Sequence, residues 1–197
     1  GLKLTKSTLF SIKKKMETRK QEDTNKGSKE GLYTKGKGQS VNETIGDRSF
    51  IAYIPNSYDN RKGLPLLVVM HGGFGSGAQI KNYIGLEPFA DQYGFIVAYL
   101  DGTQVAAKLP AKFKGWNAGE CCGQPQAKNI DDVGFIGNVI DTMHSKYGID
   151  KGHVYGTGHS NGAMMTQRVM CETSLYKDAI TLSGTLQMNV KTCPHAK

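Results

Sequence analysis

Short runs of consecutive apolar residues constrain the fold of this chain more than any other feature. The clearest runs are residues 64–70 and 95–100, followed by 153–157 and the weaker 179–182. Residues 50–54 add a shorter strand pattern. A strand that is apolar at successive positions needs cover on both faces, as in a parallel sheet between two layers of helices.

Helical patterns separate these runs and predict the covering layers. They occupy residues 86–93, 131–147 and 161–171. The middle pattern is the clearest, because its apolar residues recur at helical spacing; they are Val133, Ile136, Ile140, Met143 and Tyr147. Alternating strands and helices predict an α/β fold, a mostly parallel sheet with helices on both faces.

The front of the chain differs from the rest in charge. Of 25 Lys/Arg and 17 Asp/Glu residues, which give a net charge of +8, residues 1–48 hold 12 and 6. We therefore assign residues 1–40 to a basic flexible leader or linker and residues 41–197 to the folded domain. The remainder is almost neutral, which argues against nucleic acid as a partner. No apolar run reaches the roughly 18 residues that a membrane span requires.

The strongest chemical signal is Gly158-His159-Ser160-Asn161-Gly162, a G-x-S-x-G motif between a predicted buried strand and a predicted helix. That setting is typical of a nucleophile elbow, in which a sharp turn exposes the serine hydroxyl. A glycine-rich turn with an incidental serine is the alternative. We predict Ser160 as the catalytic nucleophile, with the Asn161 N–H at a helix N-terminus as one oxyanion donor.

A second glycine motif, His71-Gly72-Gly73, directly follows the buried strand at residues 64–70. Small residues let a backbone approach a substrate carbonyl, so the Gly73 N–H is the predicted second donor. His71, Gly72, Trp116 and His159 are the candidate substrate-binding residues. For Trp116, a wall of the acyl pocket and a buried loop anchor remain open, and His71 fits a brace for the loop better than a proton carrier.

From about residue 48 to residue 194 the chain resembles the secreted polyhydroxybutyrate depolymerase and feruloyl-esterase-like group of α/β-hydrolases. Six blocks in the family's order carry the resemblance: Arg48-Ser49-Phe50, His71-Gly72-Gly73, Asp101-Gly102-Thr103, residues 116–119 with Cys121-Cys122-Gly123, residues 131–135, and residues 158–165. The resemblance implies hydrolysis through an acyl-enzyme, with hydroxyalkanoate polyesters or hydroxycinnamoyl esters of plant polysaccharides as substrates. It implies no cofactor.

The sequence departs from the family's pattern after Ser160. The family's triad continues with an Asp and a His on later loops, whereas only Asp178 and His195 follow here. We therefore expect a C-terminally incomplete α/β-hydrolase domain that extends through the elbow and the next strand. His195 as a relocated base is the alternative. A non-catalytic binding protein and a serine peptidase on the same scaffold are the competing functions.

Other residues have structural and functional interpretations. Asp131 and Asp132 fit helix N-capping better than a metal site or a carboxylate pair, and no Cys/His spacing predicts a metal. The cysteines, Cys121, Cys122, Cys171 and Cys193, fit two disulfides in an oxidising compartment, including a vicinal bond and a Cys171–Cys193 bond, or free thiols. We expect a secreted protein without a membrane span. The sequence does not predict the oligomeric state.

Overall fold

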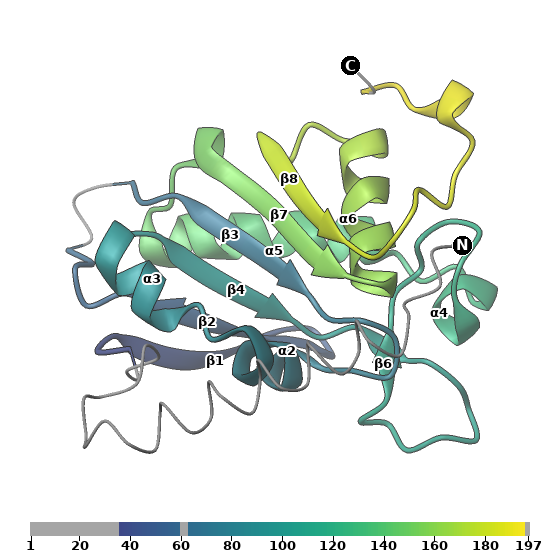
Figure 1. Ribbon diagram of the computed structural model, residues 1–197, viewed down its shortest axis with the longest axis horizontal. Coiled ribbons are helices and arrows are strands. Elements are labelled where there is room, and N and C mark those ends of the chain that lie inside the picture. Colours follow the sequence, from purple (N-terminus) through teal and green to yellow (C-terminus); the bar gives the residue numbers. More distant parts are fainter. Residues whose placement is uncertain (1–35, 60–62, 196–197) are drawn as a thin grey trace, which may run out of the picture. The chain divides into compact units, whose positions relative to one another are not determined.

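A computed structural model describes residues 36–59 and 63–195. Its centre is a six-stranded sheet in the order β1-β2-β4-β3-β7-β8 (Figure 1). The strands are β1 (Gln39–Ile45), β2 (Arg48–Ile54), β3 (Leu66–Met70), β4 (Ile96–Leu100), β7 (Val154–His159) and β8 (Asp178–Leu182). The last four run parallel, and β1 and β2 are antiparallel to their neighbours. The predicted mostly parallel sheet is confirmed.

The strand β1 is the one strand of this sheet that the sequence did not predict. It begins at Gln39, within the range assigned to the leader, whose residues 1–35 lie outside the described part of the chain. Its inward side alternates Val41, Glu43 and Ile45, so a charged residue interrupts the apolar pattern. Glu43 is buried because Lys146 Nζ and Tyr147 Oη donate hydrogen bonds to it from the neighbouring helix. These bonds outweigh the effect of burial and lower the pKa of Glu43.

Helices cover both faces of the sheet (Figure 1). One face packs against α5 (Asp132–Tyr147) and α6 (Asn161–Glu172), and the other against α2 (Gly77–Ile84) and α3 (Glu87–Tyr93). None of the described helices is long and apolar enough to cross a membrane. The helix α2 was not predicted, because Ile80 is its only large buried residue.

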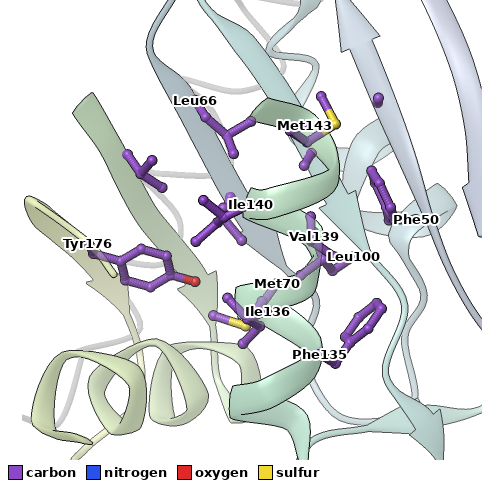
Figure 2. Packing of buried hydrophobic residues seen from close by; sticks show 14 of the residues in the cluster. Phe50, Leu66, Met70, Leu100, Phe135, Ile136, Val139, Ile140, Met143 and Tyr176 are labelled. Carbon is purple, nitrogen blue, oxygen red and sulfur yellow. The ribbon is translucent and has the colours of Figure 1, made fainter. Parts of the chain in front are cut away.

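The helix α5, which the sequence predicted, contributes five buried residues to the core on its face, and Val133 and Tyr147 of the predicted stripe are partly buried. Its buried residues pack against Phe50, Leu66, Met70 and Leu100 of the sheet (Figure 2); they are Phe135, Ile136, Val139, Ile140 and Met143. The helix ends at Gly148, whose φ of 61° suits a residue without a side chain.

The parallel strands place three loops at one edge of the sheet. Because β3, β4 and β7 run in the same direction, the chain leaves each of them at the same edge. The loop after β4 is long. It contains the short strands β5 (Thr103–Gln104) and β6 (Lys114–Gly115) and the short helix α4 (Gly123–Ala127). The motifs at the start of β2 and after β3, β4 and β7 therefore lie at this same edge.

Candidate active site

Ser160 occupies a strained turn between β7 and α6. Its backbone has φ 52° and ψ −120°, a conformation that costs a non-glycine residue roughly 1–3 kcal/mol. Its side chain does not cap the helix that it begins, so the hydroxyl is not used by the helix N-terminus. The Ser160 N–H donates to the Leu182 carbonyl at 2.9 Å, which ties the turn to the end of β8.

The two elbow glycines permit close packing of α6 on the sheet. A Cβ on Gly158 would overlap the Gly162 carbonyl group, and a Cβ on Gly162 would overlap the carbonyl oxygens of Met70 and His71. Only glycine therefore lets the first turn of α6 touch the end of β3. This contact brings Asn161 beside the loop that follows β3.

The backbone of Gly72 and Gly73 lies next to the elbow. A Cβ on Gly73 would stand 3.9 Å from Asn161 Cβ, and a Cβ on Gly72 would stand 3.5 Å from Ser160 Cβ. The first N–H groups of a helix have no acceptor within it, and they carry the positive end of its dipole. The start of α6 at Asn161 and the backbone of Gly73 therefore lie side by side.

His71 orients this loop from beneath. Its side chain is fully buried, its Nε2 accepts a hydrogen bond from the Gly102 N–H at 3.0 Å, and its Nδ1 lies 2.7 Å from the Gly72 carbonyl oxygen. Because a carbonyl only accepts, Nδ1 carries the proton. Burial lowers the pKa of His71 to about 4, so the ring is neutral near pH 7.

The bond to the Gly72 carbonyl also sets the direction of the next N–H. A carbonyl oxygen and the following N–H belong to one planar trans peptide and point in opposite directions. The Gly75 N–H holds the same oxygen at 3.1 Å. His71 therefore positions the Gly73 N–H, and its buried, neutral ring is not arranged to exchange protons with a substrate.

Trp116 is fully buried behind the same loop, which favours the anchor over the pocket wall. Its Nε1 donates to the His71 carbonyl at 2.9 Å, and the two rings are 5.0 Å apart. Its backbone N–H and carbonyl form bonds of 2.7 and 3.1 Å with the side-chain amide of Asn161. Trp116 thus joins the loop after β4 to the loop after β3 and to the elbow, and its buried ring does not face a substrate.

A buried ion pair lies beside the loop after β4 and holds it in place. Asp132 accepts from Arg48 Nη2 at 2.8 Å and from the Asn117 N–H at 2.7 Å, and its side chain is fully buried. Burial raises the pKa of Asp132, although Arg48 opposes this. Asp131 caps α5 by accepting from the Gly134 N–H at 2.8 Å. The prediction of helix capping is therefore confirmed for Asp131. It is wrong for Asp132, because its carboxylate pairs with Arg48 of the distant strand β2 instead of with the N–H groups of α5.

Asp101 holds the elements around the loop after β4. Its carboxylate accepts from Lys114 Nζ at 2.8 Å, Ser49 Oγ at 2.9 Å and the Gly77 N–H at 2.8 Å. Burial alone would raise the pKa of Asp101, but these donors outweigh it and the pKa lies below its ordinary value. Asp101 thus fixes the start of α2 beside the loop after β3.

A hollow of about 210 Å³ opens at Ser160. Gly72, Gly73, His159 and Ser160 form one side of it, and α2 forms the other with Gln79, Ile80 and Tyr83. The sequence did not point to these α2 residues. The sequence signal that could have predicted α2 is Ser76, a residue type typical of a helix N-cap. Its hydroxyl accepts a hydrogen bond from the Gln79 N–H at 3.1 Å.

The two remaining candidates for a triad lie away from Ser160. The His195 N–H donates to the Cys171 carbonyl at 3.3 Å, near the end of α6, and Ser160 precedes the start of that 12-residue helix. Such a helix is about 18 Å long. Asp178 is the first residue of β8, and it therefore lies at the end of the sheet where the parallel strands begin, whereas Ser160 lies where they end. Within residues 36–59 and 63–195, no imidazole or carboxylate forms a hydrogen bond with Ser160 Oγ.

The cysteines form the Cys121–Cys122 and Cys171–Cys193 disulfides. The second ties the end of α6 to the segment that follows β8, and the first lies in the loop after β4. Among the described side chains, no group of three His, Cys, Asp or Glu residues could hold a metal ion.

Comparisons with known proteins relate the chain to esterases. No family model matches it. Feruloyl esterase B of Piromyces equi is 31% identical over 125 residues, which are 64% of this chain and 22% of that protein. Acetylxylan esterase A of Aspergillus awamori is 33% identical over 141 residues, which are 67% of this chain and 40% of that protein. The chain thus spans less than half the length of these relatives.

Solved structures show the same fold. The acetyl xylan esterase from Aspergillus awamori superposes with a TM-score of 0.59 at 24% identity, over 76% of this chain and 53% of that structure. The poly(3-hydroxybutyrate) depolymerase LpqC from Bordetella parapertussis gives 0.52 at 18% identity, over 72% and 50%. Both likenesses establish an α/β-hydrolase arrangement of the sheet and helices.

Proposed function

The chain has the α/β-hydrolase fold and is homologous to feruloyl and acetylxylan esterases, and on this premise we propose that it takes part in carboxylic-ester hydrolysis with Ser160 as the nucleophile. The observation that carries the proposal is the strained backbone of Ser160 beside the backbone of Gly72 and Gly73 and the N-terminus of α6. A strained serine at the start of a helix costs stability, and this cost is typical of functional sites.

The proposed reaction passes through an acyl-enzyme. Ser160 Oγ attacks the ester carbonyl carbon, and the N–H groups of Gly73 and Asn161 stabilise the oxyanion. The alcohol leaves when the carbon–oxygen bond breaks, and it takes the proton that Ser160 lost. Water then hydrolyses the acyl-serine bond and restores the hydroxyl. A general base would raise the nucleophilicity of Ser160, and the proposal assigns that role to no described residue.

The proposed substrates are esters of the kinds named for the relatives. Feruloyl and acetylxylan esters, together with hydroxyalkanoate polyesters, share the carbonyl that the two donors would bind. We also propose an oxidising, extracellular location. Two disulfides in the described chain support it, because such bonds are rare in reducing compartments.

Labelling with a fluorophosphonate probe tests the nucleophile directly. We expect the protein to label and the Ser160→Ala variant to remain unlabelled, with both folded by circular dichroism. Turnover of methyl ferulate, acetylated xylotriose and a 3-hydroxybutyrate trimer would then rank the substrates. An unlabelled, folded protein would instead favour the non-catalytic binding function.

A further inference from the structure

The hollow at Ser160 has a wall that the proposed chemistry does not use. Gln79 and Tyr83 of α2 line it, four residues apart, and therefore lie one above the other on one helix face. Ile80 beside them is buried against Val69, Val97 and Tyr99, which holds this face of α2 toward the hollow. Asp101 fixes the start of the same helix.

Tyr83 presents an aromatic ring to solvent at this wall. Its side chain is 83% exposed, whereas Tyr53 and Tyr99 are buried and donate hydrogen bonds to the carboxylates of Asp91 and Glu87. An exposed tyrosine contributes little to folding. A rigid amphipathic ring that lines a binding hollow can instead cover the apolar face of a bound ring.

Two hydrogen-bonding side chains line the hollow together with Tyr83. A Cβ on Gly75 would overlap Gln79 Oε1, which places the Gln79 amide against the loop after β3. His159 Nδ1 would be 3.1 Å from a Cβ on Gly72, and both His159 and Gln79 are exposed. An amide and an imidazole supply donors and acceptors for hydroxyl groups in the hollow that Ser160 also lines.

The volume of the hollow limits what it can hold. Sites for drug-sized ligands measure about 300–1,000 Å³, so 210 Å³ suits a single ring. An aliphatic polyester segment carries hydrogen-bond acceptors but no donors and no ring, so it would pair with the N–H groups of this wall but not with the Gln79 carbonyl oxygen or the face of Tyr83. A hydroxylated ring satisfies both the polar and the aromatic side chains.

We propose that Gln79 and Tyr83 are specificity-determining residues that bind the sugar ring carrying the ester, with Tyr83 stacked on the ring and Gln79 bonded to a hydroxyl. This inference deepens the proposed function and rests on it. It separates sugar esters from polyesters, a choice that the motifs left open.

The test compares Tyr83→Ala and Gln79→Ala with Tyr93→Ala. Tyr93 is 70% exposed on the neighbouring helix α3 and does not line this hollow, so it is a matched control. We expect Tyr83→Ala to lower kcat/KM about tenfold on acetylated xylotriose and less than about twofold on 4-nitrophenyl acetate. Gln79→Ala should act in the same direction with a smaller effect. Tyr93→Ala should match the unmutated protein on both esters.

A binding measurement keeps the inference separate from activity. In a Ser160→Ala background, calorimetry with xylotriose and cellotriose should show sugar binding that Tyr83→Ala weakens about tenfold, and the stronger sugar identifies the ring. Binding that depends on Tyr83 without any turnover would refute the proposed hydrolysis and leave the subsite standing. Normal turnover with equal effects on both esters, or with none, would refute the subsite. Neither turnover nor binding would refute both.

Discussion

The two sides of Ser160 differ in the burial and the hydrogen bonding of their side chains. On the side of β3 and β4, buried and half-buried side chains with polar groups each make two or more hydrogen bonds; they are His71, Trp116, Asp132 and Asn161, with the half-buried Asp101. On the side of β8, Ile180 and Leu182 are 72% and 55% exposed. There an apolar hollow of about 730 Å³ extends over β3, β7 and β8.

The difference shows which part of the site is preorganised by the described residues. The proposed donors at Gly73 and Asn161 are held by a network that draws on β2, on the loops after β3 and β4, and on the helices α2, α5 and α6. On the β8 side, Ser160 donates one backbone hydrogen bond to Leu182, and the backbone of Gly184 packs against the Ser160 carbonyl. Substitutions should therefore cost much on the first side and little on the second.

The largest effect is expected from the buried ion pair. Arg48→Met leaves the Asp132 carboxylate buried without its counter-charge, which costs about 3–5 kcal/mol. Urea denaturation would measure the change in the free energy of unfolding. Lys151→Met is the matched control, because it breaks the exposed pair with Asp141 and should cost less than about 1 kcal/mol. Equal losses in both variants would contradict the comparison.

The next largest effect is the dependence of the free energy of unfolding on pH through His71. Burial lowers the pKa of His71 from 6.5 to about 4 in the folded state, so between these values the unfolded chain binds more protons. Its stabilising contribution is complete above pH 6.5 and is lost progressively as the pH falls to 4, by up to about 3 kcal/mol. Urea denaturation at pH 7.5, 6.0 and 5.0 would measure this slope.

The variant His71→Gln serves as the control for that slope. It removes the titrating group, so its free energy of unfolding should fall less steeply between pH 7.5 and 5.0, whatever its stability at neutral pH. If the variant and the unmutated protein showed the same slope, the buried neutral histidine would not be responsible.

A smaller effect on stability is expected from alanine substitution of two glycines of the site, and the two should differ. Gly162→Ala forces a Cβ onto the carbonyl oxygens of Met70 and His71 and should cost about 1–3 kcal/mol. Gly73→Ala meets only Asn161 Cβ at 3.9 Å and should leave the melting temperature almost unchanged. Differential scanning calorimetry would measure both. A Gly162→Ala variant as stable as Gly73→Ala would show that α6 can shift away from β3.

The smallest effect is expected on the β8 side. Ile180→Thr keeps the branched Cβ that suits a strand and alters a side chain that is largely exposed. The free energy of unfolding should change by less than about 0.5 kcal/mol. A loss above 1 kcal/mol in urea denaturation would indicate that this face is covered in the protein, and the contrast between the two sides would then weaken.

The sequence predicted the regular elements well where apolar patterns were uninterrupted. The strands β3 and β4 and the helix α5 lie within one or two residues of their predicted bounds. It failed at β1, where Glu43 faces inward, and at α2, where Ile80 alone provides the buried surface. In both cases a long-range partner or a neighbouring layer stabilises a segment whose own pattern is weak.

By itself, the sequence determined the fold class and the elbow, because strand burial, glycine placement and the position of Ser160 are local properties of the chain. Only the tertiary structure decided what surrounds Ser160. The pairing of Asp132 with Arg48, the burial of Trp116 beneath the loop and the approach of Tyr83 join residues that are far apart in the chain. Such contacts depend on how the layers pack, and no local pattern records them.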